Sequence, residues 1–392
     1  MTRNLGYAAT AAALTALSVG AVQASDIRLY GIIDTGIITE HNHSAGHSVK
    51  QDFGINLGPR LGASIWEDLG DNLKAHVEIE NLFESDNGAM RFNRLFSGHA
   101  HAGLKGNFGE FSLGRMGSLS SPFGQWGIFG MEATPFGYGW GHAGGVYWIE
   151  GGDRVDNAVA YATPAFGNVT LYAQYSLETG EDFKAGEESA HTGNNNRRAS
   201  LGVKYQTEKV TIVGVADQIW HPAPGTNHGL AGEKNTQILS LTTNFAVSDN
   251  LRLYVMGQAF KNAYLIPGAP AYDAVDLLGP RLEDGNSDGI RGRGFDGIVA
   301  AVSAKIQAGG GELLLTATYD RFKYQGAVRD GDQTKASRWL AGVAYDYPLS
   351  KRTHVYASAN VARGTGLLDS KNFSDSGDPN AEQVMFGMTH FF

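Results

Sequence analysis

Apolar and polar side chains alternate with a period of two through most of the chain. In residues 169–177 every odd position is apolar, so a strand there would have one apolar face. Residues 73–83 repeat the pattern, and one face of this strand would carry Leu73, Ala75, Val77 and Ile79. The opposite face would carry Lys74, His76, Glu78 and Glu80. Because these four side chains need water, the pattern favours strands with lipid on one side and water on the other.

The alternation divides the chain into sixteen expected strands. They span residues 27–38, 51–66, 73–84, 99–106, 110–116, 154–164, 168–179, 198–206, 209–220, 235–247, 250–262, 294–307, 312–325, 336–347, 353–363 and 382–392. Single-chain bacterial barrels have an even number of strands, with short turns on one rim and long loops on the other. Short turns such as 106–109 and 164–167 alternate here with long polar loops. We therefore expect an all-β fold, a 16-stranded antiparallel transmembrane β-barrel.

The last strand ends the chain on an aromatic residue. Its apolar face would carry Val384, Phe386, Met388 and Phe392. Glycine, threonine and another aromatic residue take the other face, as expected of a strand between lipid and a lumen. The chain is therefore expected to end in a membrane.

The beginning of the chain has the features of an export signal. Arg3 precedes a short apolar run, residues 8–22, and Val22-Gln23-Ala24 is an acceptable signal-peptidase site before Ser25. We expect residues 1–24 to be a cleaved signal peptide and residues 25–392 to form the barrel. No segment of the mature chain holds the roughly 18 consecutive apolar residues that a spanning helix needs.

Composition narrows the class of protein further. The 392 residues include 53 glycines and no cysteine, and 18% are charged. Without disulfides, the stability of an exported chain has to come from another source, such as a closed hydrogen-bonded ladder. The net charge of -9 disfavours nucleic acid as a partner.

Several short stretches resemble the trimeric general porins of beta-proteobacteria, the neisserial-type family, over essentially the whole mature chain. They are residues 29–34 (LYGIID), 60–62 (RLG), 67–70 (EDLG), 92–94 (FNR), 113–115 (LGR), 153–157 (DRVDN) and 349–353 (LSKRT). The resemblance implies a homotrimer in the bacterial outer membrane, in contact with lipid and lipopolysaccharide. It also implies that the third external loop folds into the lumen and narrows it, and that the insertion machinery recognises the last strand through Phe392.

Residues 117–153 have the properties of that loop. The segment is rich in Gly, Trp and Phe, contains no Lys or Arg, and carries Glu132, Glu150 and Asp153. A loop of this length without regular structure is usually functional. Its backbone groups could not be paired in hydrocarbon, so packing inside the lumen is the expected solution.

The resemblance places basic side chains of the wall opposite this loop. The matched positions are Arg60, Arg94, Arg115 and Arg154, and Lys74 joins them by its inward parity. Arg115 shares parity with Leu113, so its inward placement requires a bulge or a strand end. Residues 95–98 are inserted relative to the family pattern. The alternative for each arginine is a solvated position at a rim.

Motifs of enzymes and cofactor sites are present only as chance matches. Residues 139–144 and 292–297 fit the dinucleotide pattern, and 285–289 fits the nucleophile-elbow pattern, but none has the required strand and helix context. Residues 284–289 resemble the start of a calcium loop whose twelfth position is Phe295 instead of glutamate. We expect no enzymatic activity and no cofactor.

Histidines are the other candidates for metal ligands. His41, His43 and His47 lie in the first external loop, and His99 and His101 share a strand face. No carboxylate or cysteine in the sequence pattern fixes a geometry around them, so solvated histidines and no metal site are expected.

The expected function is passive diffusion of small hydrophilic solutes and ions through a water-filled pore. Opposed fixed charges would then give a modest anion preference. A substrate-specific channel is the alternative within transport, and its aromatic ladder could come from Phe123, Trp126, Phe129, Phe136, Tyr138, Trp140, Tyr147 and Trp148. A structural or adhesive surface barrel, or a secreted β-protein that binds carbohydrate, remains open from the residues alone.

Overall fold

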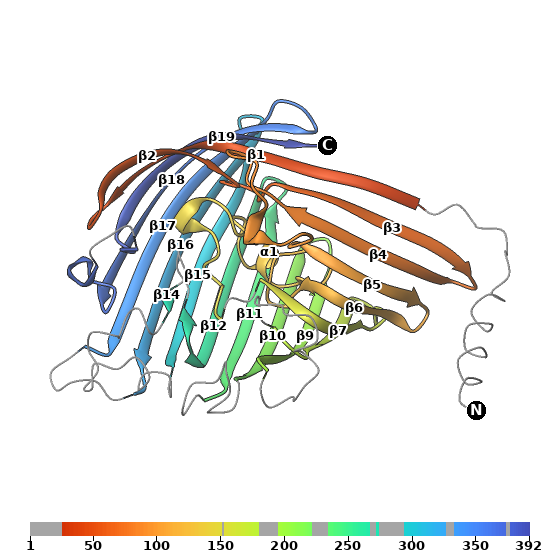
Figure 1. Ribbon diagram of the computed structural model, residues 1–392. Helices are drawn as coiled ribbons and strands as arrows, with labels where there is room; N and C mark the ends of the chain where they lie inside the picture. Colours follow the sequence, from red (N-terminus) through yellow and green to blue (C-terminus); the bar gives the residue numbers. More distant parts are fainter. Residues whose placement is uncertain are drawn as a thin grey trace, which may run out of the picture.

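The protein folds into one closed antiparallel sheet, seen in a computed structural model (Figure 1). The structure describes residues 26–150, 153–179, 195–221, 234–266, 272–273, 294–326, 333–373 and 377–392. The strands of the wall are β1 (Asp26–Asn42), β2 (Gly46–Phe53), β3 (Arg60–Gly70), β4 (Leu73–Leu82), β5 (His99–Gly106), β6 (Gly109–Gly117), β7 (Arg154–Ala162), β8 (Val169–Ser176), β9 (Arg197–Gln206), β10 (Val210–Trp220), β11 (Thr236–Ser248), β12 (Leu251–Ala263), β15 (Phe295–Ala308), β16 (Gly311–Tyr324), β17 (Lys335–Pro348), β18 (Thr353–Gly366) and β19 (Ala381–Phe391).

The ring closes where the first strand meets the last. β1 pairs with β19 from Ile32↔Phe391 to Asn42↔Ala381, and from β3 to β19 each wall strand pairs with the next wall strand along the chain. β2 and β3 share one position in the wall, because β2 pairs with the second half of β1 and β3 with its first half. The seventeen segments therefore make the sixteen-stranded antiparallel barrel that the alternation predicts.

The prediction of one continuous second strand over residues 51–66 is wrong, because the structure divides it into two. The chain leaves the sheet between Phe53 and Arg60, where Gly54 has a positive φ and Pro59 has no N–H to donate. The Asp34 carboxylate supports the break, since it accepts the backbone N–H of Asn56 (3.4 Å) and Leu57 (3.2 Å). A short hairpin of β13 (Leu265–Ile266) and β14 (Tyr272–Asp273) was not predicted either.

The two faces of the wall have the polarity that the alternation predicts. Outward-facing apolar side chains are exposed, among them Leu171 at 46% and Phe386 at 51%. The opposite face of the same strands carries buried polar groups such as Gln174 and Thr389. The signal peptide expected at residues 1–24 lies outside the described residues.

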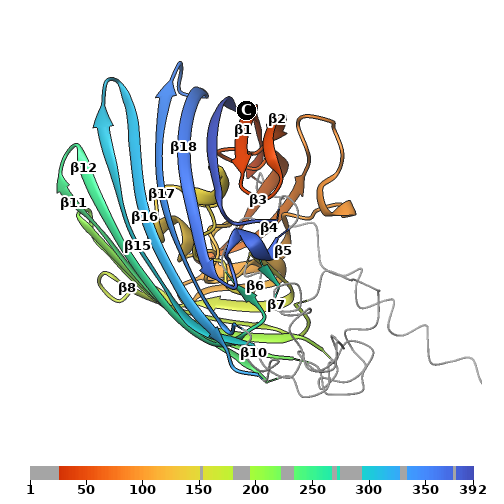
Figure 2. The ribbon, with the colours of Figure 1, turned by 90° about the vertical axis from the view of Figure 1, so that its left-hand side faces the viewer.

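The segment between β6 and β7 packs against the inner face of the wall (Figure 2). It contains a short helix α1 (Gly130–Ala133), which contacts β10, β11 and β12, and a 3-10 turn η2 (Gly141–Ala143), which contacts β17 and β18. Two further 3-10 turns, η1 (Arg91–Asn93) and η6 (Ser370–Asn372), lie in other connections. Among the described residues, none of the helices has the length and hydropathy to cross a membrane.

The exposed apolar face of β8 generates the first prediction. Leu171→Arg should lower the free energy of unfolding in lipid vesicles by about 2–4 kcal/mol if the residue lies near the bilayer midplane, because a guanidinium would enter hydrocarbon. Thr170→Arg, on the opposite face of the same strand, is the control and should cost less. Equal unfolding free energies for wild type and Leu171→Arg would contradict the assigned facing.

Candidate functional site

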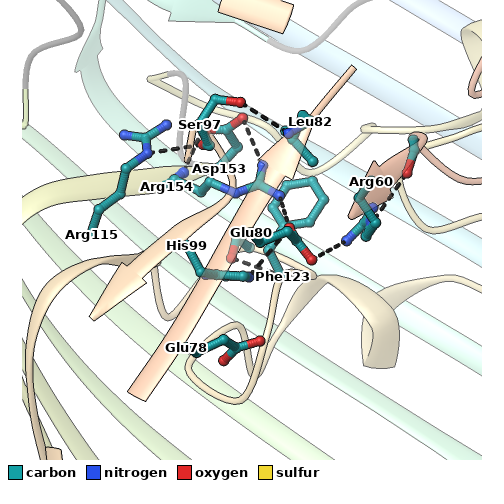
Figure 3. Close-up of polar contacts among 12 residues, drawn as sticks. Arg60, Glu78, Glu80, Leu82, Ser97, His99, Arg115, Phe123, Asp153 and Arg154 are labelled. Carbon is teal, nitrogen blue, oxygen red and sulfur yellow. Dashed lines mark hydrogen bonds and ion pairs between the residues drawn. The ribbon is translucent and has the colours of Figure 1, made fainter. Parts of the chain in front are cut away.

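Two arginines of the wall share one buried glutamate on the inner face of the barrel. Glu80 of β4 lies 3.5 Å from Arg60 Nη1 on β3 and 3.4 Å from Arg154 Nη2 on β7 (Figure 3). The Glu80 and Arg154 side chains are only 3% and 2% exposed, and that of Arg60 is 12% exposed. The carboxylate is therefore placed to balance the charge of two guanidinium groups that have little access to solvent.

Aromatic side chains of the β6–β7 segment cover this cluster. The Phe123 ring centroid lies 3.9 Å from the guanidinium carbon of Arg154, a cation–π contact. The Tyr138 hydroxyl accepts a hydrogen bond from Arg60 Nη2 and another from the backbone N–H of Gly58, the latter at 2.9 Å. The arginines thus fix the segment to the wall on this side of the barrel.

A second carboxylate, Asp156 of β7, holds the other two predicted arginines. Arg94 donates two hydrogen bonds to it, at 2.7 and 2.9 Å, and Arg115 donates one at 2.9 Å. The β6–β7 register shifts between Gly114 and Met116, so a bulge turns Arg115 inward while Leu113 faces out. This is the bulge that the parity of Arg115 requires. None of the four arginines is a solvated rim residue.

The other predicted charges lie apart from the arginines, with one exception. Asp153 Oδ2 is 3.6 Å from Arg154 Nη1 and therefore joins the cluster. Glu132 accepts from Lys204 at 2.8 Å, and Glu150 from the backbone N–H of Tyr264. Lys74 has the predicted inward parity but lies six residues from Glu80 along β4, a separation of about 20 Å.

Further charged pairs on the inner wall were missed by the sequence reasoning. Arg198 of β9 and Asp217 of β10 are 3.0 Å apart, and Ser120 of the β6–β7 segment bonds to both. Arg338 and Asp320 form a buried pair on β17 and β16 at 2.8 Å. The carboxylates that pair with the four predicted arginines could have been found in the sequence. Glu80 has inward parity, and Asp156 follows Arg154 by two residues. The long-range partners of Arg198 and Arg338 had no such signal.

The histidines of β5 correct an expectation. His99 and His101 were expected to be solvated, but they are 2% and 4% exposed. The β6–β7 segment covers His99, since a Cβ added at Gly124 would lie 2.8 Å from the His99 ring. Glu80 and Glu78 lie 3.8 and 3.3 Å from these two histidines.

Most of the aromatic residues of the β6–β7 segment are buried and pack it onto the wall. Trp126, Phe129, Phe136, Trp140 and Tyr147 are each at most 2% exposed. Burial also lowers the pKa of His142 in this segment to about 4, so its ring is neutral at pH 7. These side chains do not form an exposed ladder along a lumen.

The closed ring, its apolar outer face and its charged inner face define a transmembrane β-barrel. The model of the Gram-negative porin family matches residues 8–367, and the chain belongs to this family. It is a porin of the bacterial outer membrane, and the family is one of channels and not of enzymes.

One relative matches nearly the whole chain, and a second matches about three fifths of it. An outer membrane porin protein of Bordetella pertussis is 27% identical, covering 97% of this chain and 98% of its own. Outer membrane porin protein 32 of Delftia acidovorans is 30% identical over 61% of this chain and 66% of its own. Among solved structures, an anion-selective porin from Comamonas acidovorans superposes with a TM-score of 0.66 at 20% identity, covering 94% of this chain and all of its own.

The shared carboxylate generates the second prediction. Glu80→Gln should lower the free energy of unfolding by about 3 kcal/mol, because two buried guanidinium groups lose their common counter-charge. Asp153→Asn is the control, since the Asp153 side chain is 26% exposed and its loss should cost about 1 kcal/mol or less. Denaturant unfolding in lipid vesicles measures both. An equal, small effect of the two substitutions would contradict the central role of Glu80.

Proposed function

We propose that the narrowest part of the channel lies between the β6–β7 segment and the arginines of β3, β6 and β7. Small hydrophilic solutes and ions would cross it by passive diffusion. The observation that carries this proposal is the attachment of the segment to Arg60 and Arg154 through Tyr138 and Phe123. The same contacts bring polar and charged groups to the part of the lumen where the segment takes up space.

The charge of this region favours anions by a small margin. Four guanidinium groups share three carboxylates in two ion-pair clusters, one around Glu80 and the other around Asp156. Arg94 and Arg60 keep the largest exposed side-chain fractions of the four, 25% and 12%. Charges more than about 8 Å away are screened at physiological salt, so the net acidity of the whole chain counts little. The proposed preference is modest because the excess is one positive charge and because the Glu78 carboxylate, which shares the Tyr30 hydroxyl with Glu80, offsets part of it.

A substrate-specific channel has weaker support. Such a channel would need aromatic side chains exposed along the lumen. The described aromatics of the β6–β7 segment are mostly buried between the segment and the wall, where they contribute packing. A general diffusion pore needs no such ladder.

The proposed assembly is a homotrimer surrounded by lipid and lipopolysaccharide. The fold of this chain matches OmpT of Vibrio cholerae in its trimer form with a TM-score of 0.61 at 15% identity. Exposed apolar side chains on the outer face of β1 and β19, such as Ile33 and Phe386, supply surface for lipid or a neighbouring subunit.

Phe392 is proposed to act in recognition by the barrel-insertion machinery. Its backbone pairs with Gly31 at the end of the β1–β19 seam, while the residue remains 48% exposed. Deletion of Phe392 should lower the amount of folded protein in the outer membrane and leave the conductance of surviving channels nearly unchanged. Phe392→Tyr, which keeps the aromatic ring, should restore assembly. Normal outer-membrane levels after the deletion would contradict this role.

Selectivity is tested by removing two arginines together. The double substitution Arg60→Ser, Arg154→Ser should shift the reversal potential in a salt gradient towards cations and slightly increase conductance. Both effects follow from the loss of two positive charges and of side-chain volume at the constriction. The wild-type preference for anions should fall as salt rises, because screening shortens the reach of the field.

Lys74→Ser is the matched control, because it removes an inward-facing cation about 20 Å from Glu80. It should leave the reversal potential nearly unchanged. A cation-preferring wild-type channel whose reversal potential the double substitution does not move would contradict the proposed constriction. Failure of the folded protein to conduct at all would instead favour a structural or adhesive role.

A further inference from the structure

Three histidines and one glutamate lie side by side where β1 meets β2 and β19. In the strand register His41 is directly opposite Glu382 on one side and directly opposite His47 on the other. His43 follows His41 by two residues, so both are expected to project from the same face. We call these four residues the seam site.

The ligand atoms of this site are already close together. One atom from each of His41, His43 and Glu382 lies within 4.8 Å of the other two. The His41 and His47 rings are stacked with their centroids 4.2 Å apart. Among the described residues, His41, His43 and Glu382 are the group of three that meets this criterion.

Two buried atoms of the site have no hydrogen-bond partner. They are His41 Nδ1 and Glu382 Oε2. The other glutamate oxygen, Oε1, is 3.3 Å from His43 Nε2 and accepts from Arg363. A buried imidazole nitrogen and a buried carboxylate oxygen left unpaired on two residues that face each other across the β1–β19 ladder are costly, and a shared cation would satisfy both.

We propose that the seam site binds a divalent transition-metal ion of the zinc type. Imidazole nitrogen and carboxylate oxygen are ordinary ligands of Zn²⁺, at about 2.0–2.2 Å, which places tetrahedral ligands about 3.3 Å apart. Small rotations of the side chains would bring the three atoms to that spacing. His41, His43 and Glu382 supply three ligands, and His47 supplies the fourth after a rotation of its ring.

The position of the site separates metal binding from conduction. His41 has the same parity as Ile33 and Ile37, which are exposed on the outer face, and Glu382 the same parity as Val384 and Phe386. The ion would therefore lie outside the lumen, ten residues from Phe392 along β19. It would connect the first strand to the last, so it would bind the closed barrel and not the unfolded chain.

The test titrates Zn²⁺ into the folded full-length mature protein in detergent by isothermal calorimetry. Wild type should bind one Zn²⁺ per chain, and binding should raise the midpoint of thermal unfolding. His41→Ala and His43→Ala should each weaken binding by at least about tenfold, since each removes a ligand. His354→Ala is the matched control, because His354 also has a carboxylate partner, Asp346 at 3.0 Å, outside the seam site.

Cu²⁺ as a second probe reports the ligands directly. Its electron paramagnetic resonance spectrum should show nitrogen coupling that His41→Ala and His43→Ala reduce and His354→Ala does not. Conductance should be the same with and without Zn²⁺. Conduction by each variant also confirms that the variant is folded. The proposal would be overturned if His41→Ala and His43→Ala channels conduct and bind Zn²⁺ as tightly as wild type. It would also be overturned if the Cu²⁺ spectrum of wild type shows no nitrogen coupling.

Discussion

A β-sheet in a membrane has to pair all of its backbone N–H and C=O groups. A polar backbone group left unpaired in hydrocarbon costs several kcal/mol, so a sheet in a membrane has to have no edge. The β1–β19 ladder removes the edge by joining residues 32–42 to residues 381–391. With the wall closed, the inner face is free to carry charges. The features inside the barrel therefore rest on a wall whose backbone hydrogen bonds are already made.

The break between β2 and β3 illustrates how a departure from the ladder is supported. Residues 54–59 leave the sheet, and their backbone groups need other partners. Asp34 on β1 supplies them from the inner face, and its carboxylate also accepts from Tyr356 of β18 and Thr389 of β19. One buried carboxylate therefore connects the break to β18 and β19, the last two strands of the ring.

Charge on the inner wall serves two purposes that compete with each other. Arg60, Arg154 and Glu80 anchor the β6–β7 segment, and burial under that segment requires the arginines to have counter-charges close by. The same counter-charges reduce the field that permeating ions experience. Asp156 has the corresponding role for Arg94 and Arg115. A pore that is held together by paired charges is expected to discriminate weakly between anions and cations.

The class of fold and the facing of the strands could be predicted from the sequence pattern. These properties follow from the period of two, which any strand between lipid and water has to obey. The inward direction of the arginines followed from the family resemblance, and for Arg115, whose parity with Leu113 points outward, it required the bulge that the structure contains. A local pattern is sufficient to predict the facing of a strand because each side chain can lie on only one of two faces.

The sequence pattern did not predict which charges meet across the barrel. Glu80 and Arg154 are 74 residues apart and come together because β4 and the start of β7 face the same segment. Glu132 and Glu150 do not pair with the arginines and instead bind groups on β9, on β11 and just after β12. His41 and Glu382 are opposite each other only because the ring closes in one register. Distances between strands depend on closure and on the packing of the β6–β7 segment, and neither is encoded in a local period.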